Sequence, residues 1–252
     1  MLISVVTCAY NSEKTIERTI KSVLSQEFQD FEYLIIDGKS TDHTLDIVKQ
    51  YESIFNGKMR YISENDKGIY DAMNKGILLS KGKYIWIVNS DDYLEPDSLK
   101  KVADRIDEKQ SEVICGYIEY FSETSDNRHI FKYTPQQSEV EFHKKRMGIV
   151  HPATIVSRKI YEEYGLYDNR FYISADMDWF LRIKENNVPI DIIDVKLSNM
   201  SDGGISSQRN NIKKRINDWD LLYKKHTSSK VEYWKFMLRR IITYYKTFVF
   251  KF

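Results

Sequence analysis

The clearest indicator of the fold is the segment Tyr84-Ile85-Trp86-Ile87-Val88-Asn89-Ser90-Asp91-Asp92. Its apolar part predicts a buried strand, and the polar residues that follow directly place two adjacent carboxylates where that strand ends. In open α/β sheets, ligands bind at the carboxyl ends of the strands. Mg²⁺ or Mn²⁺ suits such a pair, because these ions take one or two carboxylates together with water and substrate phosphates. The segment therefore suggests a metal-bound nucleoside diphosphate.

Upstream of this segment, short apolar runs alternate with helical periods. The runs are rich in β-branched or aromatic residues and cover 2–7, 31–36 and 59–62. Apolar side chains recur at helix spacing between and after the runs, at Ile16, Ile20, Val23 and Leu24, at Leu45 and Val48, at Ile69, Ala72, Met73 and Ile77, and at Leu99, Val102 and Ile106. This alternation predicts right-handed βαβ crossovers and a mainly parallel sheet with helices on both faces.

After residue 110 the pattern becomes antiparallel. Strands at 113–121 and 129–133 flank the polar turn 122–127, which predicts a hairpin. Residues 134–150 have the composition of a loop. The remaining predicted elements are a short helix at 158–164 ended by Gly165, a helix at 176–184, a strand at 190–197 and a flexible turn at 201–204.

The composition is that of a globular protein without a dominant charge. With 252 residues and 42% hydrophobic content, the chain can form a substantial core as one large domain or two small ones. A net charge of +1 gives no electrostatic argument for nucleic acid as a partner. Cys8 and Cys115 lie in apolar runs, which favours buried thiols and a reducing compartment over a disulfide or a metal pair. The chain starts without a basic leader and lacks a long uncharged apolar run, so we expect a cytosolic protein without a spanning helix.

The tail, residues 234–252, mixes aromatic residues with lysine and arginine and contains no acid. This composition suits an interfacial amphipathic helix whose basic residues meet anionic lipid headgroups on the inner face of the cell membrane. The alternative is a C-terminal helix that packs its aromatic side chains on the core.

Side chains that follow the first two strands can face a ligand at the same sheet edge. Thr7, Tyr10 and Asn11 close the first strand with a hydroxyl, an aromatic ring and an amide. Asp37 ends the second strand and precedes Gly38, which permits close approach of the backbone. Asp37 suits a base imide or a ribose hydroxyl, whereas a cap of the following helix better fits Thr41 or Asp42.

Taken in order, these segments closely resemble glycosyltransferase family 2, the nucleotide-sugar-dependent enzymes that assemble bacterial surface polysaccharides. The matching segments are the opening strand with Thr7, Tyr10 and Asn11, the turn Asp37-Gly38-Lys39-Ser40-Thr41-Asp42, the stretch Lys67-Gly68-Ile69-Tyr70-Asp71-Ala72-Met73-Asn74-Lys75-Gly76, and the carboxylate pair, which matches the DXD-type metal motif of the family. The resemblance implies an α/β GT-A fold, with a Rossmann-like nucleotide-binding part, a mainly parallel central sheet, an antiparallel acceptor half and C-terminal helices. It spans 1–205, divided into a nucleotide-sugar half (1–110) and an acceptor half (111–205), and leaves 206–252 as a helical extension.

The resemblance also implies the residues of a donor site. Those expected to bind the nucleotide sugar are Thr7, Tyr10, Asn11, Asp37, Asp66, Asn74, Asn89 and Asp91. The metal motif of the family commonly begins with Asp, but Asn89 occupies that position here, so a ribose contact there would use an amide. Asp91 is the expected ligand of Mn²⁺ or Mg²⁺, and Asp92 is the second choice.

In the acceptor half, His151-Pro152-Ala153-Thr154, Gly165-Leu166-Tyr167-Asp168 and Ser174-Ala175-Asp176-Met177-Asp178-Trp179-Phe180-Leu181-Arg182 resemble the segment that ends in the Glu-Asp catalytic motif of the family. Ala175 replaces the first acid. Asp176 matches the second, the general base of inverting members. Asp178 more readily caps or salt-bridges the following helix, and His151 suits either a substrate contact or a fixed turn before proline.

The reaction that the resemblance implies is an inverting transfer of a hexose or N-acetylhexosamine from a UDP-sugar to a hydroxyl. A saccharide on a polyprenyl diphosphate, used in surface polysaccharide synthesis, would explain an interfacial tail. Two alternatives stay open: a catalytically inactive sugar-nucleotide-binding partner in a membrane assembly, and a nucleotidyltransferase. The second needs a basic, Gly-rich loop after the first strand, and 10–14 contains no glycine. A dinucleotide dehydrogenase is poorer still, because no G-x-G-x-x-G follows Thr7.

Overall fold

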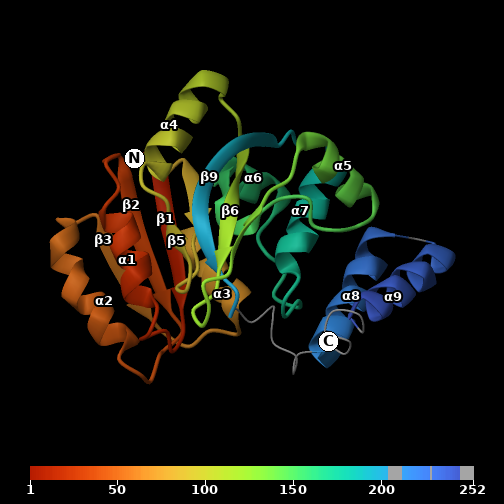
Figure 1. Cartoon of the computed structure of the whole chain (residues 1–252), viewed down its shortest axis with the longest axis horizontal. Helices are drawn as coiled ribbons and strands as arrows, with labels where there is room; N and C mark the ends of the chain where they lie inside the picture. Colours follow the sequence, from red (N-terminus) through yellow and green to blue (C-terminus); the bar gives the residue numbers. More distant parts are fainter. Residues whose placement is uncertain (204–211, 228, 245–252) are drawn as a thin grey trace.

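A mixed nine-stranded sheet forms the centre of the molecule. The computed structural model describes residues 1–203, 212–227 and 229–244 (Figure 1). The strand order is β3-β2-β1-β4-β8-β6-β9-β5, and β7 pairs with β6 at the side. The strands of the first half are β1 (Ile3–Ala9), β2 (Phe31–Asp37), β3 (Met59–Ser63) and β4 (Tyr84–Ile87), and their pairings with one another are parallel.

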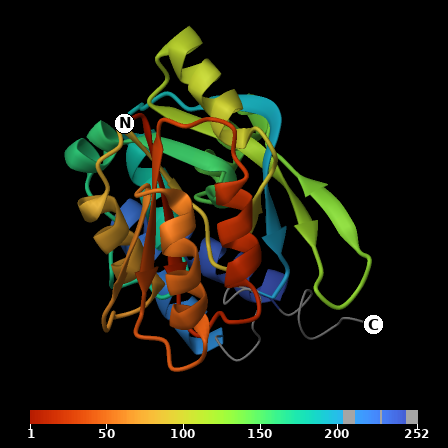
Figure 2. The ribbon, with the colours of Figure 1, turned by 90° about the vertical axis from the view of Figure 1, so that its left-hand side faces the viewer.

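Helices cover both faces of this parallel half, as the alternating pattern predicts. They are α1 (Ile16–Leu24), α2 (Thr44–Glu52), the 3-10 turn η1 (Ser53–Phe55) and α3 (Ile69–Leu79). Figure 2 shows α1 and α2 in front of the sheet. Right-handed crossovers put α3 on the other face, where a Cβ at Gly76 would come within 2.3 Å of Val6 Cγ1. Because both faces are covered, every residue of β1 and β2 is buried.

The second half joins the same sheet through antiparallel pairings. Its elements are β5 (Tyr93–Leu94), α4 (Ser98–Lys109), β6 (Val113–Phe121), β7 (Arg128–Phe131), β8 (Thr154–Ser157) and β9 (Asp191–Ser201). β8 runs antiparallel to both β4 and β6, whereas β6 and β9 are parallel. The predicted β6–β7 hairpin is confirmed. β5 and β8 are too short to stand out from the sequence pattern, and neither was predicted.

One expectation for this half is wrong. Residues 134–150 do not form a loop throughout, because α5 occupies Pro135–His143. The signal was present: Thr134 and Gln137 form a capping box, and proline takes the first helical position. The 3-10 turn η2 (His151–Ala153) precedes β8. The helix α6 (Arg158–Tyr164) follows β8 and ends, as expected, before Gly165, whose φ is 83. The helix α7 (Ala175–Glu185) comes next in the chain.

The C-terminal extension contains α8 (Ile212–His226) and α9 (Lys230–Tyr244), drawn in blue beside α7 in Figure 1. One side of α9 packs on α8, where the Phe236 and Tyr223 rings lie 4.8 Å apart. The other side exposes a stripe of large apolar side chains: Val231, Trp234, Leu238, Ile241 and Ile242. The packed side agrees with the alternative in which the helix packs its aromatic side chains inward, and contact with a membrane stays a prediction. The predicted boundary at 205 and the tail beyond 244 lie outside the described residues.

The two cysteines and the lengths of the helices also bear on the sequence predictions. Cys8 and Cys115 are free and buried, as the sequence predicts. Within 1–203, 212–227 and 229–244, no helix has the length and hydropathy needed to cross a bilayer.

Candidate active site

The carboxyl ends of β1 and β2 bring several of the predicted donor residues together. Tyr10 follows β1 and is 64% exposed. A Cβ at Gly38, just after β2, would lie 2.5 Å from Asp66 Oδ2 and 3.4 Å from Tyr10 Cδ2. Only glycine fits at position 38 without displacing that carboxylate. Tyr10, Gly38 and Asp66 therefore form one compact surface at the sheet edge, with an open aromatic face suited to stacking on a base.

The loops of this edge are fixed by side-chain hydrogen bonds. Asn11 has a positive φ of 49, and its Oδ1 accepts from the Thr41 backbone amide at 2.9 Å. Asp37 is fully buried and accepts from Ser40 and from Ser63 Oγ, the latter at 2.6 Å. Thr7 is also buried, and its Oγ1 accepts from the Tyr33 hydroxyl. Asp37 and Thr7 thus support the loops at this edge from below the surface. Their direct contacts with a sugar-nucleotide donor stay predictions. The amide of Thr44, the first residue of α2, donates to Asp42, which supports the helix-start interpretation of that acid.

The two acids after β4 have different surroundings. Asp92 is 1% exposed, and its Oδ1 accepts from the Ser201 amide at 3.0 Å. Burial, reinforced by the charge of Asp91, raises the pKa of Asp92 well above its usual range. Asp91 is half-buried; burial raises its pKa, and the nearby Arg18 opposes that rise. Within the described part of the chain, no other residue donates a hydrogen bond to the Asp91 carboxylate. Asp91 is therefore the less constrained of the two acids.

The oxygen atoms of the loop after β4 suit a hard divalent cation. Asn89 Oδ1 is buried without a hydrogen-bond partner, while its Nδ2 donates to Asp92 Oδ2 at 3.3 Å. An unpartnered amide oxygen and a carboxylate two residues along the same loop are oxygen ligands of the kind that Mg²⁺ or Mn²⁺ takes, with water and phosphates in its other positions. Across the described ranges, no three His, Cys, Asp or Glu side chains gather as a metal site.

Arg18 of α1 is a site residue that sequence reasoning missed. Its Nη2 donates to the Asp91 carbonyl at 2.8 Å and pairs with Glu123 at 2.6 Å. The guanidinium carbon lies 4.6 Å from the centroid of the Phe121 ring. Arg18 therefore fixes the acidic loop and places a positive charge beside it. A basic residue on an amphipathic helix usually faces solvent, so nothing in the sequence distinguishes Arg18 from a surface residue.

The predicted base, Asp176, lies in the first turn of α7, at the edge where α3 begins. The Tyr70 hydroxyl shares its one proton between the Ile173 carbonyl, at 2.5 Å, and Asp176 Oδ1, at 3.1 Å. Burial and the charge of Asp176 raise the pKa of Tyr70 well above its usual range, so this hydroxyl keeps its proton. Oδ1 also accepts from the Met177 amide at 2.9 Å. Tyr70 lies inside the stretch that carries the family resemblance, but it was not among the predicted site residues.

Two further residues singled out in the sequence, Asn74 and His151, both form hydrogen bonds with Tyr167. Asn74 Oδ1 accepts from the Tyr167 amide, and Nδ2 donates to the Tyr167 carbonyl and to Asn169. This amide is occupied by the acceptor half, so its contact with a donor stays a prediction. The His151 ring bonds to the Tyr167 hydroxyl at 3.0 Å. Burial lowers the pKa of His151, and the charge of Asp176 opposes that shift.

Asp178 has the surroundings of a structural acid. It is fully buried and lies 2.9 Å from His226 Nε2 and 2.9 Å from Lys225 Nζ. Arg182 pairs with it from the next turn of α7. Burial alone would raise the pKa of Asp178, but these partners outweigh burial and hold it below its usual range. The geometry supports the salt-bridge interpretation of Asp178 over a catalytic one, with α8 docked on α7 as the result.

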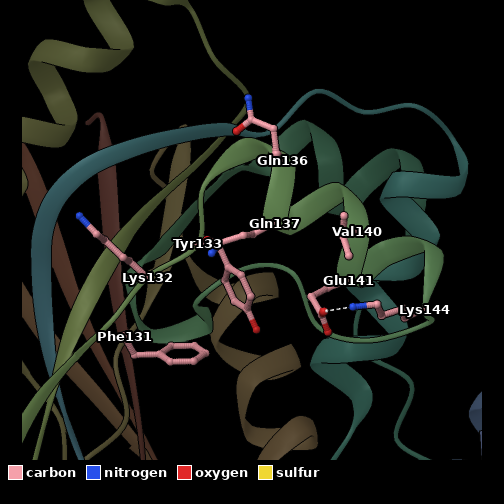
Figure 3. Close-up of a pocket in the computed structure, with 8 residues that line it drawn as sticks. All are labelled: Phe131, Lys132, Tyr133, Gln136, Gln137, Val140, Glu141 and Lys144. Atoms are coloured by element: carbon pink, nitrogen blue, oxygen red, sulfur yellow. Dashed lines mark hydrogen bonds and ion pairs between the residues drawn. The ribbon is translucent and has the colours of Figure 1, made fainter.

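The acceptor half also contains an open groove of about 470 Å³ (Figure 3). It lies between the end of β7 and α5, and it is lined by Phe131, Lys132, Tyr133, Gln136, Gln137, Val140, Glu141 and Lys144. Its volume is in the range of small-ligand sites. None of the predicted donor or metal residues lines it, so the groove is separate from the carboxylate edge.

The chain has clear relatives among known proteins. The model of the family described as Glycosyl transferase family 2 matches residues 4–165. The poly(ribitol-phosphate) beta-N-acetylglucosaminyltransferase TarS of Staphylococcus aureus is 32% identical over 179 residues, which is 70% of this chain and 30% of TarS. An uncharacterized glycosyltransferase of Methanocaldococcus jannaschii is 26% identical over 96% of this chain and 87% of its own length. The chain thus spans less than a third of TarS.

Solved structures give the same picture of the fold. S. aureus TarS 1–349 in complex with UDP-GlcNAc superimposes with a TM-score of 0.70 at 21% identity, covering 98% of this chain and 73% of that one. The mannosyltransferase PcManGT from Pyrobaculum calidifontis, in complex with GDP-Man and Mn²⁺, gives a TM-score of 0.67 at 13% identity, covering 93% and 67%. At these identities the likeness shows the architecture alone.

Proposed function

The chain belongs to glycosyl transferase family 2 and has the GT-A fold, and from this premise we propose that it transfers N-acetylglucosamine from UDP-GlcNAc to a hydroxyl acceptor with inversion. The observation that carries the proposal is the presence of two acids at the carboxyl edge of the parallel strands. Asp91 follows β4, and Asp176 reaches the same edge through its hydrogen bond from Tyr70 at the start of α3. GlcNAc is favoured among hexoses and N-acetylhexosamines, because TarS is named as an N-acetylglucosaminyltransferase and was solved with UDP-GlcNAc.

In the proposed mechanism Asp176 acts as the general base. The acceptor oxygen attacks the anomeric carbon as its proton passes to a carboxylate oxygen of Asp176, and the bond from that carbon to UDP breaks on the opposite side. Oδ1 of Asp176 is held by the Tyr70 hydroxyl and by the Met177 amide. A base fixed in this way needs little reorganisation during the reaction. Ala175 leaves Asp176 without an acidic neighbour before it in the chain.

Asp91, with Asp92 as the second choice and the amide oxygen of Asn89, would hold Mn²⁺ or Mg²⁺ at the donor diphosphate. When bound, the ion supplies Lewis-acid stabilisation of the charge that develops on the leaving UDP. The chain itself fixes this ligand set, because Arg18 holds the Asp91 carbonyl and Ser201 holds Asp92. Tyr10 and Asp66 would bind the nucleoside on the other side of the edge.

A screen of donors tests the proposal. With Mn²⁺ present, we expect UDP-GlcNAc to raise the thermal midpoint more than UDP-glucose or UDP-galactose, and to be cleaved slowly to UDP in the absence of acceptor. A ligand at 100 times its Kd stabilises the fold by about 2.7 kcal/mol, which is readily measured. Binding of UDP-GlcNAc without any release of UDP would favour the inactive-partner alternative. Stabilisation by nucleoside triphosphates and not by nucleotide sugars would favour a nucleotidyltransferase.

For the acceptor we propose a saccharide on a polyprenyl diphosphate, used in surface polysaccharide synthesis at the inner face of the cell membrane. The exposed stripe of α9 supports this part of the proposal. Trp234 is 70% exposed, and Lys235 and Arg239 are exposed close to it on the same helix. Aromatic and aliphatic side chains next to basic ones suit a helix that lies in the headgroup region of an anionic bilayer.

Vesicle binding tests this surface. Changing Trp234 and Leu238 together to serine should lower the fraction of protein bound to phosphatidylglycerol vesicles about tenfold, because each side chain removes apolar area from the contact. Leu78→Ser is the matched control: Leu78 is as exposed as Trp234 but lies on α3. Sedimentation with vesicles at low and high salt measures the effect. Equal binding of the double variant and the wild type would contradict the membrane assignment.

A further inference from the structure

Helix α8 places a buried carboxylate against the turn that precedes Asp176. Asp218 is 3% exposed. Its Oδ1 accepts from the Tyr172 amide at 2.9 Å, and its Oδ2 accepts from the Ile173 and Ser174 amides at 2.6 and 3.0 Å. Three consecutive backbone N–H groups thus converge on one side chain. Ser174 is the residue just before α7, so the bonded turn leads directly into the helix that carries Asp176.

The position of Asp218 is electrostatically unfavourable. Burial raises the pKa of Asp218, the three amides lower it, and the charge of Asp176 raises it again, with a net increase. In the described part of the chain, no lysine, arginine or histidine forms an ion pair with Asp218. Backbone dipoles are therefore its counter-charges. A second carboxylate close to the predicted base is a costly way to close a turn, because a neutral side chain would avoid the repulsion.

The same turn is held from its other side by the nucleotide-sugar half. The Ile173 amide donates to Asp218, whereas the Ile173 carbonyl accepts from the Tyr70 hydroxyl at 2.5 Å. The same hydroxyl proton is shared with Asp176 Oδ1. The Ile173 residue is consequently clamped between α3 and α8, two elements far apart in the sequence. Loss of either contact would leave the turn before α7 held from one side only.

We propose that Asp218 is a positioning residue for catalysis: by bonding the 172–174 turn, it holds Asp176 where an acceptor hydroxyl can reach it. The inference rests on the proposed role of Asp176 as the base. The proposal gives α8 of the C-terminal extension a role in positioning the base, although the match to the family model ends at residue 165.

The effect should appear in kcat and not in donor binding, because Asp218 contacts no predicted donor residue. A misplacement of about 1 Å at a catalytic group can lower the rate on the order of 100-fold. We therefore expect Asp218→Ala to lower kcat for release of UDP from UDP-GlcNAc about 10- to 100-fold. Asp218→Asn keeps one oxygen for the three amides and should fall between Ala and the wild type. The donor KM and the donor-induced rise in thermal midpoint should stay unchanged.

Asp220→Asn is the matched control on the same helix. Asp220 accepts from the Tyr233 hydroxyl at 2.6 Å and pairs with Lys224, so it ties α9 to α8 without touching the turn. Its variant loosens the extension but should keep kcat. Rates are expressed per folded molecule, counted by donor binding, so that a purely structural role leaves kcat unchanged. If Asp218→Ala fails to fold, Asp218→Asn carries the test.

Equal kcat for Asp218→Asn and the wild type would overturn the inference, and so would equal losses for Asp218→Asn and Asp220→Asn. In both cases the wild type still releases UDP, and the proposed function stands. A wild type that binds UDP-GlcNAc but releases no UDP would instead overturn the proposed function and this inference with it.

Discussion

Replacing Asp176 with asparagine should lower kcat for UDP release from UDP-GlcNAc by about 10²- to 10⁴-fold, which is the usual contribution of a general base. The amide cannot take the proton of the attacking hydroxyl. Its oxygen can still accept from the Tyr70 hydroxyl and the Met177 amide, the two bonds that hold the carboxylate. Folding should therefore change little, and donor binding should be retained. Steady-state rates, the thermal midpoint and the donor-induced shift measure the three effects separately.

Asp178→Asn gives the opposite pattern and serves as the control. Asp178 is buried among Arg182, Lys225 and His226, and removal of one partner from a buried ionic cluster costs about 3–5 kcal/mol. We expect a clear loss of stability with nearly normal kcat per folded molecule. Near-normal turnover in Asp176→Asn would remove Asp176 from the role of base. A large loss of kcat in stable Asp178→Asn would move that role two residues along α7.

Replacing Asp91 with asparagine should have the second largest effect. An ion that stabilises the leaving diphosphate contributes several kcal/mol, so kcat/KM should fall on the order of 10²- to 10³-fold. The half-buried Asp91 carboxylate receives no hydrogen bond from another described side chain, so the thermal midpoint without ligand should hardly move. Titration with Mn²⁺ at fixed UDP-GlcNAc, followed by thermal shift and by UDP release, measures the loss.

Asp92→Asn separates the two carboxylates. Its amide oxygen can still accept from the Ser201 amide, so the end of β9 should stay in place. If Asp91 is the main ligand, Asp92→Asn should need only a modestly higher Mn²⁺ concentration than the wild type. Equal losses in the two variants would mean that both acids hold the ion. Activity of Asp91→Asn at wild-type Mn²⁺ levels would contradict the metal assignment.

The sequence allowed the parallel half of the fold to be predicted because its signals are local. The 84–88 strand is apolar throughout and ends at polar residues, and the α3 stripe from Ile69 to Ile77 has helix spacing. β8 is only Thr154–Ser157, and its place between β4 and β6 depends on pairings with residues about 40 to 70 positions away in the sequence. No window around 154 contains that information. The capping box of α5, in contrast, is a local signal, because Thr134 and Gln137 alone indicate the start of a helix.

The same distinction applies to the site. Asp91 and Asp176 belong to short motifs with a characteristic residue order, so each was predicted from its own neighbours. Arg18 and Asp218 belong to helical segments rich in charged residues, and their roles depend on contacts 73 and 44 to 46 residues distant. For Asp37 the motif predicts a ligand contact, which stays a prediction, and the structure adds that Ser40 and Ser63 donate hydrogen bonds to its carboxylate. Motifs identify which acids matter, and tertiary contacts decide what each one does.

The clamp on Ile173 has a consequence for the order of events on the ribosome. Translation delivers β1, α3 and α7 before α8, so the sheet and the helix that carries Asp176 emerge from the exit tunnel while Asp218 is still inside it or unsynthesised. During that interval the Tyr70 side of the turn can form, and the Asp218 side cannot. A nascent chain would then acquire a nucleotide-binding edge before it has a fixed base. If the chain has the proposed function, transfer would start only once α8 has docked on the turn before α7.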